Sequence, residues 1–353
     1  MINLNDVKMV HVEASSRCNS RCPMCSRYDA LGFTQSGLKE DNLSFNLFAK
    51  LFTGEFCSQL EHVYFSGVYG DPCINPNLPK MVSWLLDNNC KGVSIDTNGG
   101  YRAASYWKSL ARPGVLINFS IDGTDNETLG KYRIGVSYEK VMKNLKAYVE
   151  EGGNAQWNFI VFKHNEHQVE HARQIADDLG IKFRIKVTQK FKKNKSFKVM
   201  KDGEHLYDLE PPDNEIYRHP NIGTSDHQPI KFSGLKLETF KDYSKKKILC
   251  SSKIKSEIFL SSSGLLFPCC YLGTNVHDSP GSHQFVKNYD MENFDLKEHE
   301  VAVILGKFLE IESKWDQTIE EGNLITCYNT CGFDNKNTLY YTEKLTKQEI
   351  IER

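Results

Sequence analysis

The sequence has no long apolar run. Its longest unbroken apolar stretches, such as residues 301–305, fall far short of the roughly 18 residues that a membrane-spanning helix needs. It also lacks an excess of charge of one sign, because 44 Lys and Arg residues face 45 Asp and Glu residues, a formal net charge of −1. That balance favours neither a nucleic acid nor a membrane as a partner. Residues 1–6 lack the basic and apolar regions of a signal peptide. We therefore expect a soluble cytoplasmic protein.

Cysteine, by contrast, is plentiful. Eleven cysteines in a cytoplasmic chain indicate metal binding or catalysis more than disulfides. Cys18, Cys22 and Cys25 are spaced Cys-x3-Cys-x2-Cys, just after the apolar run 9–12. Three thiolates can hold one face of an iron–sulfur cube and leave its fourth iron open, and open metal positions are where chemistry occurs. A zinc site would need a fourth ligand, for which His11 lies badly on the preceding strand, and a disulfide would leave one cysteine over.

Strand and helix patterns alternate along the first half of the chain, which predicts a parallel α/β sheet. The predicted strands are residues 9–12, 62–65, 92–97, 116–121, 156–162 and 182–187. The predicted helices are residues 45–60, 138–151 and 168–179. In such sheets the reactive groups lie at the carboxyl ends of the strands, where the cysteine loop follows the first strand. Several prolines and many charged residues over 188–248 predict an irregular insertion or connector.

The cysteine spacing and the six strand–helix units resemble the radical S-adenosylmethionine (radical SAM) superfamily. The resemblance implies a partial (β/α)6 barrel over residues 1–187, with a [4Fe–4S] cluster on the three cysteines. It further implies that the open iron chelates SAM, and that one electron yields a 5′-deoxyadenosyl radical. An electron donor of the flavodoxin or ferredoxin type is implied as the partner.

Other strand ends resemble the SAM-binding motifs of that family. The segment from Ser66 to Asp71 is similar to its Gly-Gly-Glu region, with Asp where Glu is more usual, and would bind the SAM amino group. Ser120 and Asp122 would take the ribose hydroxyls, and Arg133 the SAM carboxylate. Each residue taken singly could be an ordinary turn residue or ion-pair member. The residues that the resemblance assigns to SAM are Met24, Ser66, Gly67, Gly70, Asp71, Asn98, Ser120, Asp122 and Arg133.

A second cysteine group lies in the C-terminal half, where a predicted hairpin around Gly264 separates two of its members. The layout resembles the twitch domain, the shortened form of the SPASM domain. The resemblance implies a small α+β domain over 249–335 with one auxiliary [4Fe–4S] cluster, and leaves 336–353 as a helical tail. The expected ligands are Cys250, Cys269, Cys327 and Cys331. A structural zinc site is the alternative, and Cys270 could replace Cys269.

Two further features have alternative interpretations. Cys73 follows Asp71 near the expected active end, where a thiol could return a hydrogen atom to a substrate radical, although a buried core residue is the simpler interpretation. A basic run over 182–201 could bind a phosphate or an acidic substrate, or could be a solvated face.

By resemblance we expect a radical SAM enzyme that takes a hydrogen atom from a substrate C–H bond. Net oxidation of a small sugar or polyol, aided by the auxiliary cluster, is the favoured outcome, because the first strand already begins at residue 9 and leaves no room before it for a peptide-binding domain. The alternatives are a peptide- or protein-modifying enzyme, of the type that matures ribosomal peptides or sulfatases, and a radical epimerase that uses Cys73. A zinc-stabilised nucleic-acid-binding protein is a remote fourth.

Overall fold

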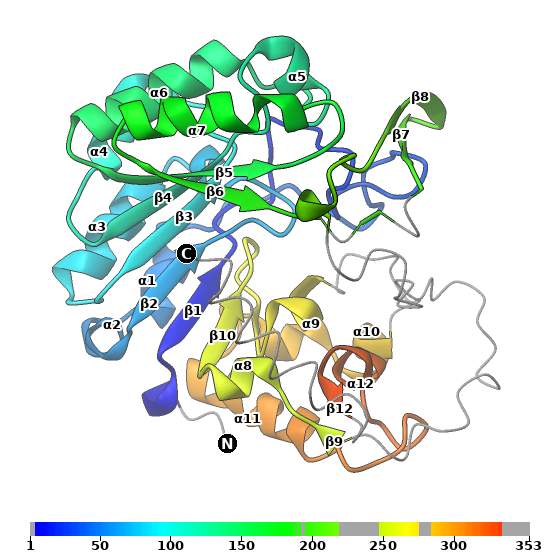
Figure 1. Cartoon of the computed structure of the whole chain (residues 1–353). Helices are drawn as coiled ribbons and strands as arrows, with labels where there is room; N and C mark the ends of the chain where they lie inside the picture. Colours follow the sequence, from blue (N-terminus) through cyan, green and yellow to red (C-terminus); the bar gives the residue numbers. More distant parts are fainter. Residues whose placement is uncertain (1–3, 189, 192–194, 219–246, 275–283, 334–353) are drawn as a thin grey trace.

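The computed structural model is organised around one eight-stranded sheet (Figure 1). It describes residues 4–188, 190–191, 195–218, 247–274 and 284–333. The strands follow the order β11-β10-β1-β2-β3-β4-β5-β6, and every pairing is parallel except that of β10 with β11. Their bounds are β1 Met9–Val12, β2 His62–Phe65, β3 Val93–Thr97, β4 Val115–Ser120, β5 Asn154–Ile160, β6 Lys182–Lys186, β10 Glu257–Leu260 and β11 Leu266–Phe267. The expected parallel α/β fold is confirmed.

Helices cover one face of this sheet (Figure 1). They are α1 Phe45–Leu51, α2 Gly54–Gln59, α3 Leu78–Asp87, α4 Ala104–Leu110, α5 Asn126–Gly130, α6 Tyr138–Glu150 and α7 Val169–Asp178. Short 3-10 turns are η1 Leu4–Asp6, η2 Pro72–Ile74, η3 Glu166–Gln168 and η4 Glu215–Tyr217. The helix predicted over 45–60 is in fact two, because the Thr53 side chain accepts a hydrogen bond from the Phe56 N–H and starts α2 afresh. No helix among the described residues is both long and apolar enough to cross a membrane.

Successive side chains along these strands lie on opposite faces of the sheet, and the two faces differ in polarity. On the helix-covered face, Val63, Ile95 and Ile117 are fully buried, as alternate residues of a parallel sheet packed against helices should be. The residues between them are polar in many places, as with Asp96 and Asn118. We call this second face the inner face. It is the concave side of a partial barrel, and its polarity shows that it is not packed as a hydrophobic core.

The C-terminal segment joins the main sheet. β10 pairs in parallel with β1, so that Met9 lies opposite Glu257 and Val12 opposite Leu260. The expected hairpin is present, with Gly264 at positive φ (+93°) in its turn, but its strands extend the barrel sheet instead of standing in a separate unit. The other C-terminal elements are β9 Lys247–Ile248, α8 Ser251–Ile254, α9 Cys270–Thr274, α10 Gln284–Asn288, η7 Met291–Phe294, α11 Val301–Glu312, α12 Ile325–Cys331 and β12 Gly332–Phe333.

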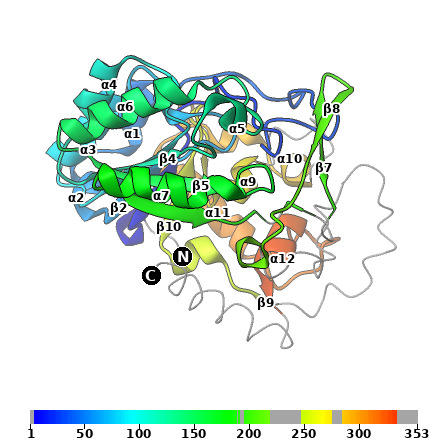
Figure 2. The same cartoon turned by 45° about the horizontal axis from the view of Figure 1, so that its top comes forward.

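Part of the expected connector is regular. β7 Phe197–Lys201 and β8 Glu204–Leu209 form an antiparallel hairpin that extends from the barrel (Figure 2). It rests on the cysteine loop, where the Gly203 N–H donates to the Leu31 carbonyl over 3.0 Å. A Cβ at Gly32 would overlap the Met200 carbonyl, so glycine is needed for this close approach. Residues 219–246 and the predicted tail over 336–353 lie outside the described residues.

Because β10 is a strand of the barrel sheet, a cavity in it should weaken the whole fold. We expect Leu260→Ala, at a fully buried position, to lower the free energy of unfolding by about 2–5 kcal/mol in one cooperative transition. The control is Ile254→Ala, at a side chain 72% exposed, which should change it by less than about 0.5 kcal/mol. Anaerobic denaturant unfolding followed by far-UV circular dichroism measures both. A separate early transition in the Leu260 variant would show that the C-terminal segment unfolds on its own.

Candidate radical site and auxiliary cysteine group

The cysteine loop leaves the carboxyl end of β1 and is tied down on both sides. The Ser16 hydroxyl donates to the Lys39 carbonyl over 2.7 Å and accepts from the Asp41 N–H over 2.8 Å. The buried Arg27 guanidinium donates to the Ser16 and Tyr69 carbonyls and pairs with Glu40. These contacts fix the loop backbone before any cluster is bound.

Hydrogen-bond donors converge on the three sulfurs. The Ser20 N–H lies 3.4 Å from Cys18 Sγ, the Ser20 hydroxyl lies 3.2 Å from Cys22 Sγ, and the Arg27 N–H lies 3.4 Å from Cys25 Sγ. Burial, together with the neighbouring Asp71, Cys22 and Cys25, raises the pKa of Cys18 to about 12. Thiols so close and so buried need a cation to ionise, and N–H donors to sulfur are typical of iron–sulfur sites.

The first cysteine group supplies a donor set that suits a [4Fe–4S] cluster. Cys18, Cys22 and Cys25 offer three thiols, and each sulfur has an N–H or O–H group nearby. In a cube each cysteine binds a different iron, so three thiols can serve three of the four irons.

The loop after β2 packs directly on the cysteine loop. A Cβ at Gly67 would overlap the Gly70 carbonyl, and a Cβ at Gly70 would overlap the Ser15 carbonyl, so both positions require glycine. The Ser66 carbonyl accepts from His11 Nε2 over 2.7 Å. The loop therefore presents its backbone beside the three cysteines, as the resemblance implies for SAM binding.

Asp71 is buried beneath this loop. Its carboxylate accepts from the Thr97 hydroxyl at 2.9 and 3.0 Å, from the Asn98 N–H at 2.8 Å and from the Cys73 N–H at 3.0 Å. Burial raises its pKa, and these donors act against that shift. In this structure Asp71 joins the ends of β2 and β3, a role that its assignment to the SAM amino group did not include. The Asn98 side chain then reaches Asn19, with Cys18 Sγ 3.9 Å away.

Asp122 and Arg133 form a buried ion pair. Arg133 Nε lies 2.6 Å from Asp122 Oδ2, and Arg133 Nη1 lies 3.5 Å from Cys22 Sγ. The other Asp122 oxygen accepts from the Ile160 N–H. Asp122 therefore orients Arg133 toward the cysteine loop, and its contact with the ribose hydroxyls stays a prediction. Ser120 ends β4 and is half-buried, and Met24 lies in a small apolar cluster with Tyr132.

Glu13 is a site residue that the sequence analysis missed. Its side chain is 1% exposed, and Oε1 accepts from the Val68 and Tyr69 N–H groups over 3.0 and 2.8 Å. Burial raises its pKa to about 7, opposed by these N–H donors, by that of Gly70 and by Arg27. The signal was present in the sequence, because an acidic residue directly after a buried strand, in phase with the inner face, must find a partner.

The second cysteine group also converges. Cys250 interacts with Cys331, and Cys269 interacts with both Cys327 and Cys250. Burial raises the pKa of Cys327 to about 12. A hydrogen bond with Cys331 lowers the pKa of Cys250 to about 6. These side chains come from the start of α8, the end of β11 and both turns of α12.

Cys270 has different electrostatic surroundings. Burial and the neighbouring Glu257 raise the pKa of its thiol, and the Glu257 carboxylate accepts a 2.7 Å hydrogen bond from the Tyr64 hydroxyl. This arrangement supports Cys269 as the fourth member of the group. Cys73 is fully buried beside Thr97 and Tyr106, which favours its interpretation as a core residue over that of a hydrogen-atom donor.

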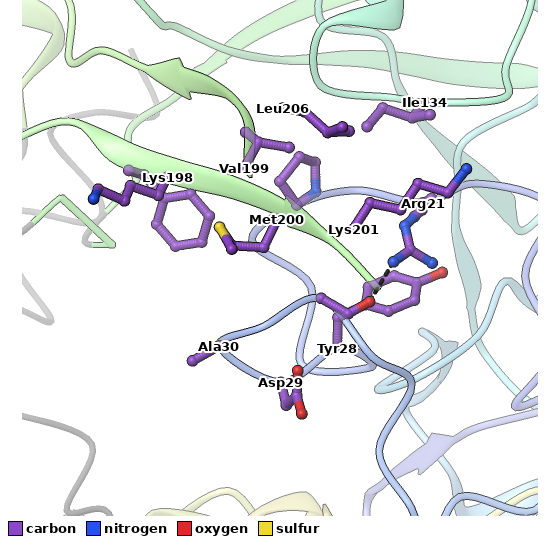
Figure 3. A pocket seen from close by; sticks show the side chains of 13 residues that line it. Arg21, Tyr28, Asp29, Ala30, Ile134, Lys198, Val199, Met200, Lys201 and Leu206 are labelled. Atoms are coloured by element: carbon purple, nitrogen blue, oxygen red, sulfur yellow. Dashed lines mark hydrogen bonds between the residues drawn. The ribbon is translucent and has the colours of Figure 1, made fainter. Parts of the chain in front are cut away.

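A pocket lies between the cysteine loop and the β7–β8 hairpin (Figure 3). On one wall the Arg21 guanidinium lies over the Tyr28 ring, 4.5 Å from its centroid, and on the other Val199 and Met200 come from the hairpin. Its volume is about 70 Å³, room for a few waters and well below that of small-molecule sites of roughly 300–1,000 Å³. The pocket therefore lies where the hairpin packs against the cysteine loop, and it is too small for a substrate site.

Comparison with known proteins finds the same family that the sequence motifs resemble. The family model of the radical SAM superfamily matches residues 12–178. The chain is 28% identical over 254 residues to a tungsten-containing aldehyde ferredoxin oxidoreductase cofactor-modifying protein of Pyrococcus furiosus, covering 69% of this chain and 67% of that protein. It is 22% identical over 151 residues to a probable GTP 3′,8-cyclase of Methanococcus maripaludis, covering 42% of this chain and 47% of the cyclase.

Among solved structures, Streptococcus suis SuiB bound to the precursor peptide SuiA aligns with a TM-score of 0.51 at 13% identity, over 86% of this chain and 68% of SuiB. At that identity the likeness establishes the fold alone. The chain spans about two thirds of the Pyrococcus protein and about half of the cyclase.

The Asp122–Arg133 pair gives a stability test. We expect Asp122→Asn to lower the free energy of unfolding by about 3–5 kcal/mol, because a buried guanidinium loses its counter-charge, and to weaken SAM binding as Arg133 loses its anchor. The matched control is Asp87→Asn in the exposed Asp87–Arg112 pair, which should cost no more than about 1 kcal/mol. Denaturant unfolding and equilibrium dialysis of SAM measure the two effects. Equal losses in both variants would contradict a special role for the buried pair.

Glu13 gives a pH test. Its pKa rises from 4.5 to about 7 on folding, so the stability from its protonated form is complete below pH 4.5 and is lost as pH rises through 7. Glu13→Gln keeps an acceptor oxygen but has no proton to lose. Relative to wild type, its free energy of unfolding should therefore rise by about 2.5 kcal/mol between pH 5 and pH 8. Unfolding curves across this range measure the difference, and a flat difference would show that Glu13 is ionised throughout.

Proposed function

Residues 12–178 belong to the radical SAM superfamily, and from this we propose that the enzyme oxidises a small polar molecule through a substrate radical. The observation that carries the proposal is the pairing of two cysteine groups with a polar inner face of the sheet. With a [4Fe–4S] cluster and SAM bound at the first group, the site supplies one electron and the 5′-deoxyadenosyl radical that takes the substrate hydrogen atom.

The chain's own residues then have distinct tasks. Cys18, Cys22 and Cys25 hold three irons, and the donors around their sulfurs stabilise the thiolate charge. Arg133, held by Asp122, offers its remaining edge to the SAM carboxylate next to Cys22. The glycine-shaped loop after β2 supplies backbone groups for the SAM amino group.

We assign an auxiliary [4Fe–4S] cluster to Cys250, Cys269, Cys327 and Cys331. The mutual electrostatic influence of these four half-buried thiols supports this assignment. Such a cluster would supply an acceptor for the electron that a substrate radical gives up as it loses a proton to solvent, and the net reaction would then be an oxidation.

A small substrate is favoured over a peptide. The inner face offers a short row of amide and carboxylate side chains, which suits hydroxyl or other compact polar groups. The names of the two curated relatives refer to a cofactor and to GTP. Burial of Cys73 argues against the epimerase alternative, and membership of this enzyme family replaces the nucleic-acid-binding alternative.

Metal content tests the two-cluster proposal. After anaerobic reconstitution we expect about eight irons per chain in wild type and about four in the triple variant Cys18→Ala, Cys22→Ala, Cys25→Ala. Cys327→Ala with Cys331→Ala should also fall to about four, and should keep SAM cleavage to 5′-deoxyadenosine while losing oxidised product.

The matched control is Cys270→Ala, which removes a neighbouring thiol that faces Glu257 and should retain about eight irons. Iron and labile sulfide assays and electron paramagnetic resonance give the result. Four irons in wild type that disappear in the triple variant would remove the auxiliary cluster and the oxidation built on it. Zinc in place of iron at the second group would have the same consequence.

A further inference from the structure

Buried polar atoms without a hydrogen-bond partner gather in the C-terminal segment. In the part of the chain that the structure describes, the buried Tyr289 Oη, Trp315 Nε1 and Asn323 Oδ1 have no partner of ordinary hydrogen-bond geometry. The Asn323 amide already donates to the Trp315 and Gln317 carbonyls, over 3.1 and 3.2 Å, and its remaining atom is an acceptor. The other two atoms are donors. Because a buried donor without an acceptor is costly, these two indicate a partner that the protein itself does not supply.

Both donors lie close to Cys327 of the second cysteine group. The Trp315 indole N–H interacts with the Cys327 thiol, which acts against the rise in the thiol pKa that burial causes. Tyr289 follows α10, and its ring packs against Phe285 and Phe294, with centroids 5.3 and 6.3 Å away. Burial and neighbouring acidic groups, among them Cys327, raise the pKa of Tyr289 to about 12, so its hydroxyl keeps a proton to donate.

The other three cysteines of this group interact with backbone donors. The N–H groups belong to α8 and α9, and the pairs are Cys250 with Ser252 and Lys253, Cys331 with Ser251, and Cys269 with Leu272. The donor to Cys327 is instead a side chain, that of Trp315. Hydrogen bonds to sulfur are one of the means by which a protein tunes an iron–sulfur cluster.

The first cysteine group divides its donors in the same way. Backbone N–H groups serve Cys18 and Cys25. Side chains serve Cys22, because the Ser20 hydroxyl lies 3.2 Å and Arg133 Nη1 lies 3.5 Å from its sulfur. A side-chain donor at one sulfur is therefore common to both groups. Such a donor can be removed by substitution, whereas a backbone N–H cannot.

Donors to sulfur favour the reduced state of a cluster. Reduction adds one negative charge to the cube, and N–H or O–H dipoles directed at its sulfurs stabilise that charge. In the proposed oxidation, a substrate radical gives one electron to the auxiliary cluster and one proton to solvent, and a one-electron carrier protein then reoxidises the cluster. A higher reduction potential makes the cluster a better acceptor in this step.

We propose that Trp315 and Tyr289 donate hydrogen bonds to the auxiliary cluster at its Cys327 corner and thereby raise its reduction potential. The inference rests on the proposed function, which assigns that cluster to the four cysteines. It gives a partner to both buried donors, and it places them where the added negative charge of the reduced cluster would lie. A water molecule as the partner would instead leave the potential independent of both side chains.

The test measures the reduction potential of the auxiliary cluster alone. The triple variant Cys18→Ala, Cys22→Ala, Cys25→Ala removes the first cluster, and Trp315→Phe or Tyr289→Phe is added to it. Each addition deletes one donor and keeps an aromatic ring. We expect each to lower the midpoint potential by about 59 mV, which corresponds to about a tenfold change in the equilibrium constant of a one-electron reduction. A redox titration followed by electron paramagnetic resonance measures the shift.

Matched controls remove the same kinds of donor elsewhere. In the triple variant, Trp84→Phe and Tyr148→Phe delete donors of α3 and α6 that bond to the Phe52 and Val115 carbonyls, over 2.7 and 3.2 Å, and should leave the potential unchanged. In deuterated water, electron–nuclear double resonance of the reduced cluster should show an exchangeable deuteron that is missing after Trp315→Phe. A purely structural role of the indole would not produce that signal.

The iron content separates the possible outcomes. The inference is overturned if both variants keep about four irons and the potential of their parent, or if their potential rises; the proposed oxidation would survive that result. If Trp315→Phe loses its iron, Tyr289→Phe, which removes a single oxygen atom, decides the result. A triple variant without iron would overturn the auxiliary cluster and this inference together.

Discussion

The active end of this barrel is organised by a carboxylate buried where β1 ends. Glu13 accepts hydrogen bonds from backbone N–H groups of the loop after β2. The two glycines of that loop allow the loop to pack closely against the cysteine loop. Asp71, at the far end of the same loop, accepts hydrogen bonds from Thr97 and Asn98 at the end of β3. Successive strand ends are therefore linked through buried acids, each of which is satisfied by backbone donors.

This linkage explains how the protein's own groups shape the site. Asp122 links the ends of β4 and β5 in the same way, because it accepts a hydrogen bond from the Ile160 N–H. It also directs one edge of Arg133 toward Cys22. An arginine held in this way loses little freedom on binding a carboxylate. The polar inner face is continuous with these groups, so binding and chemistry share one rigid support.

Local patterns predicted most of the sheet because buried strands with a helix-covered face have a clear period of two. β1 and β2 have the predicted bounds, and the other barrel strands differ from prediction only at their ends. The pairing of β10 with β1 was not predictable, since no local pattern encodes which distant strand lies beside which. The β7–β8 hairpin could not be predicted, because charged residues such as Lys198 and Glu204 interrupt the alternation of apolar and polar residues in its strands.

At the site, residue types were easier to predict than partners. The cysteines could be recognised by their spacing, whereas the protein contacts of Asp71 with Thr97 and of Asp122 with Arg133 could not be predicted. Such partners come from other strands, and only the assembled sheet brings them together. Glu13 escaped notice for the same reason, because its donors lie in the loop after the next strand.

The position of β10 beside β1 has a consequence for biosynthesis. β1 has β2 on one side, but its other neighbour, β10, is synthesised about 250 residues later, at a usual rate of roughly 5–20 residues per second. Until then the nascent barrel has an open edge of unpaired backbone groups at β1, the kind of edge that invites pairing with another chain. A growing chain therefore carries this exposed edge throughout the interval between the synthesis of β1 and that of β10.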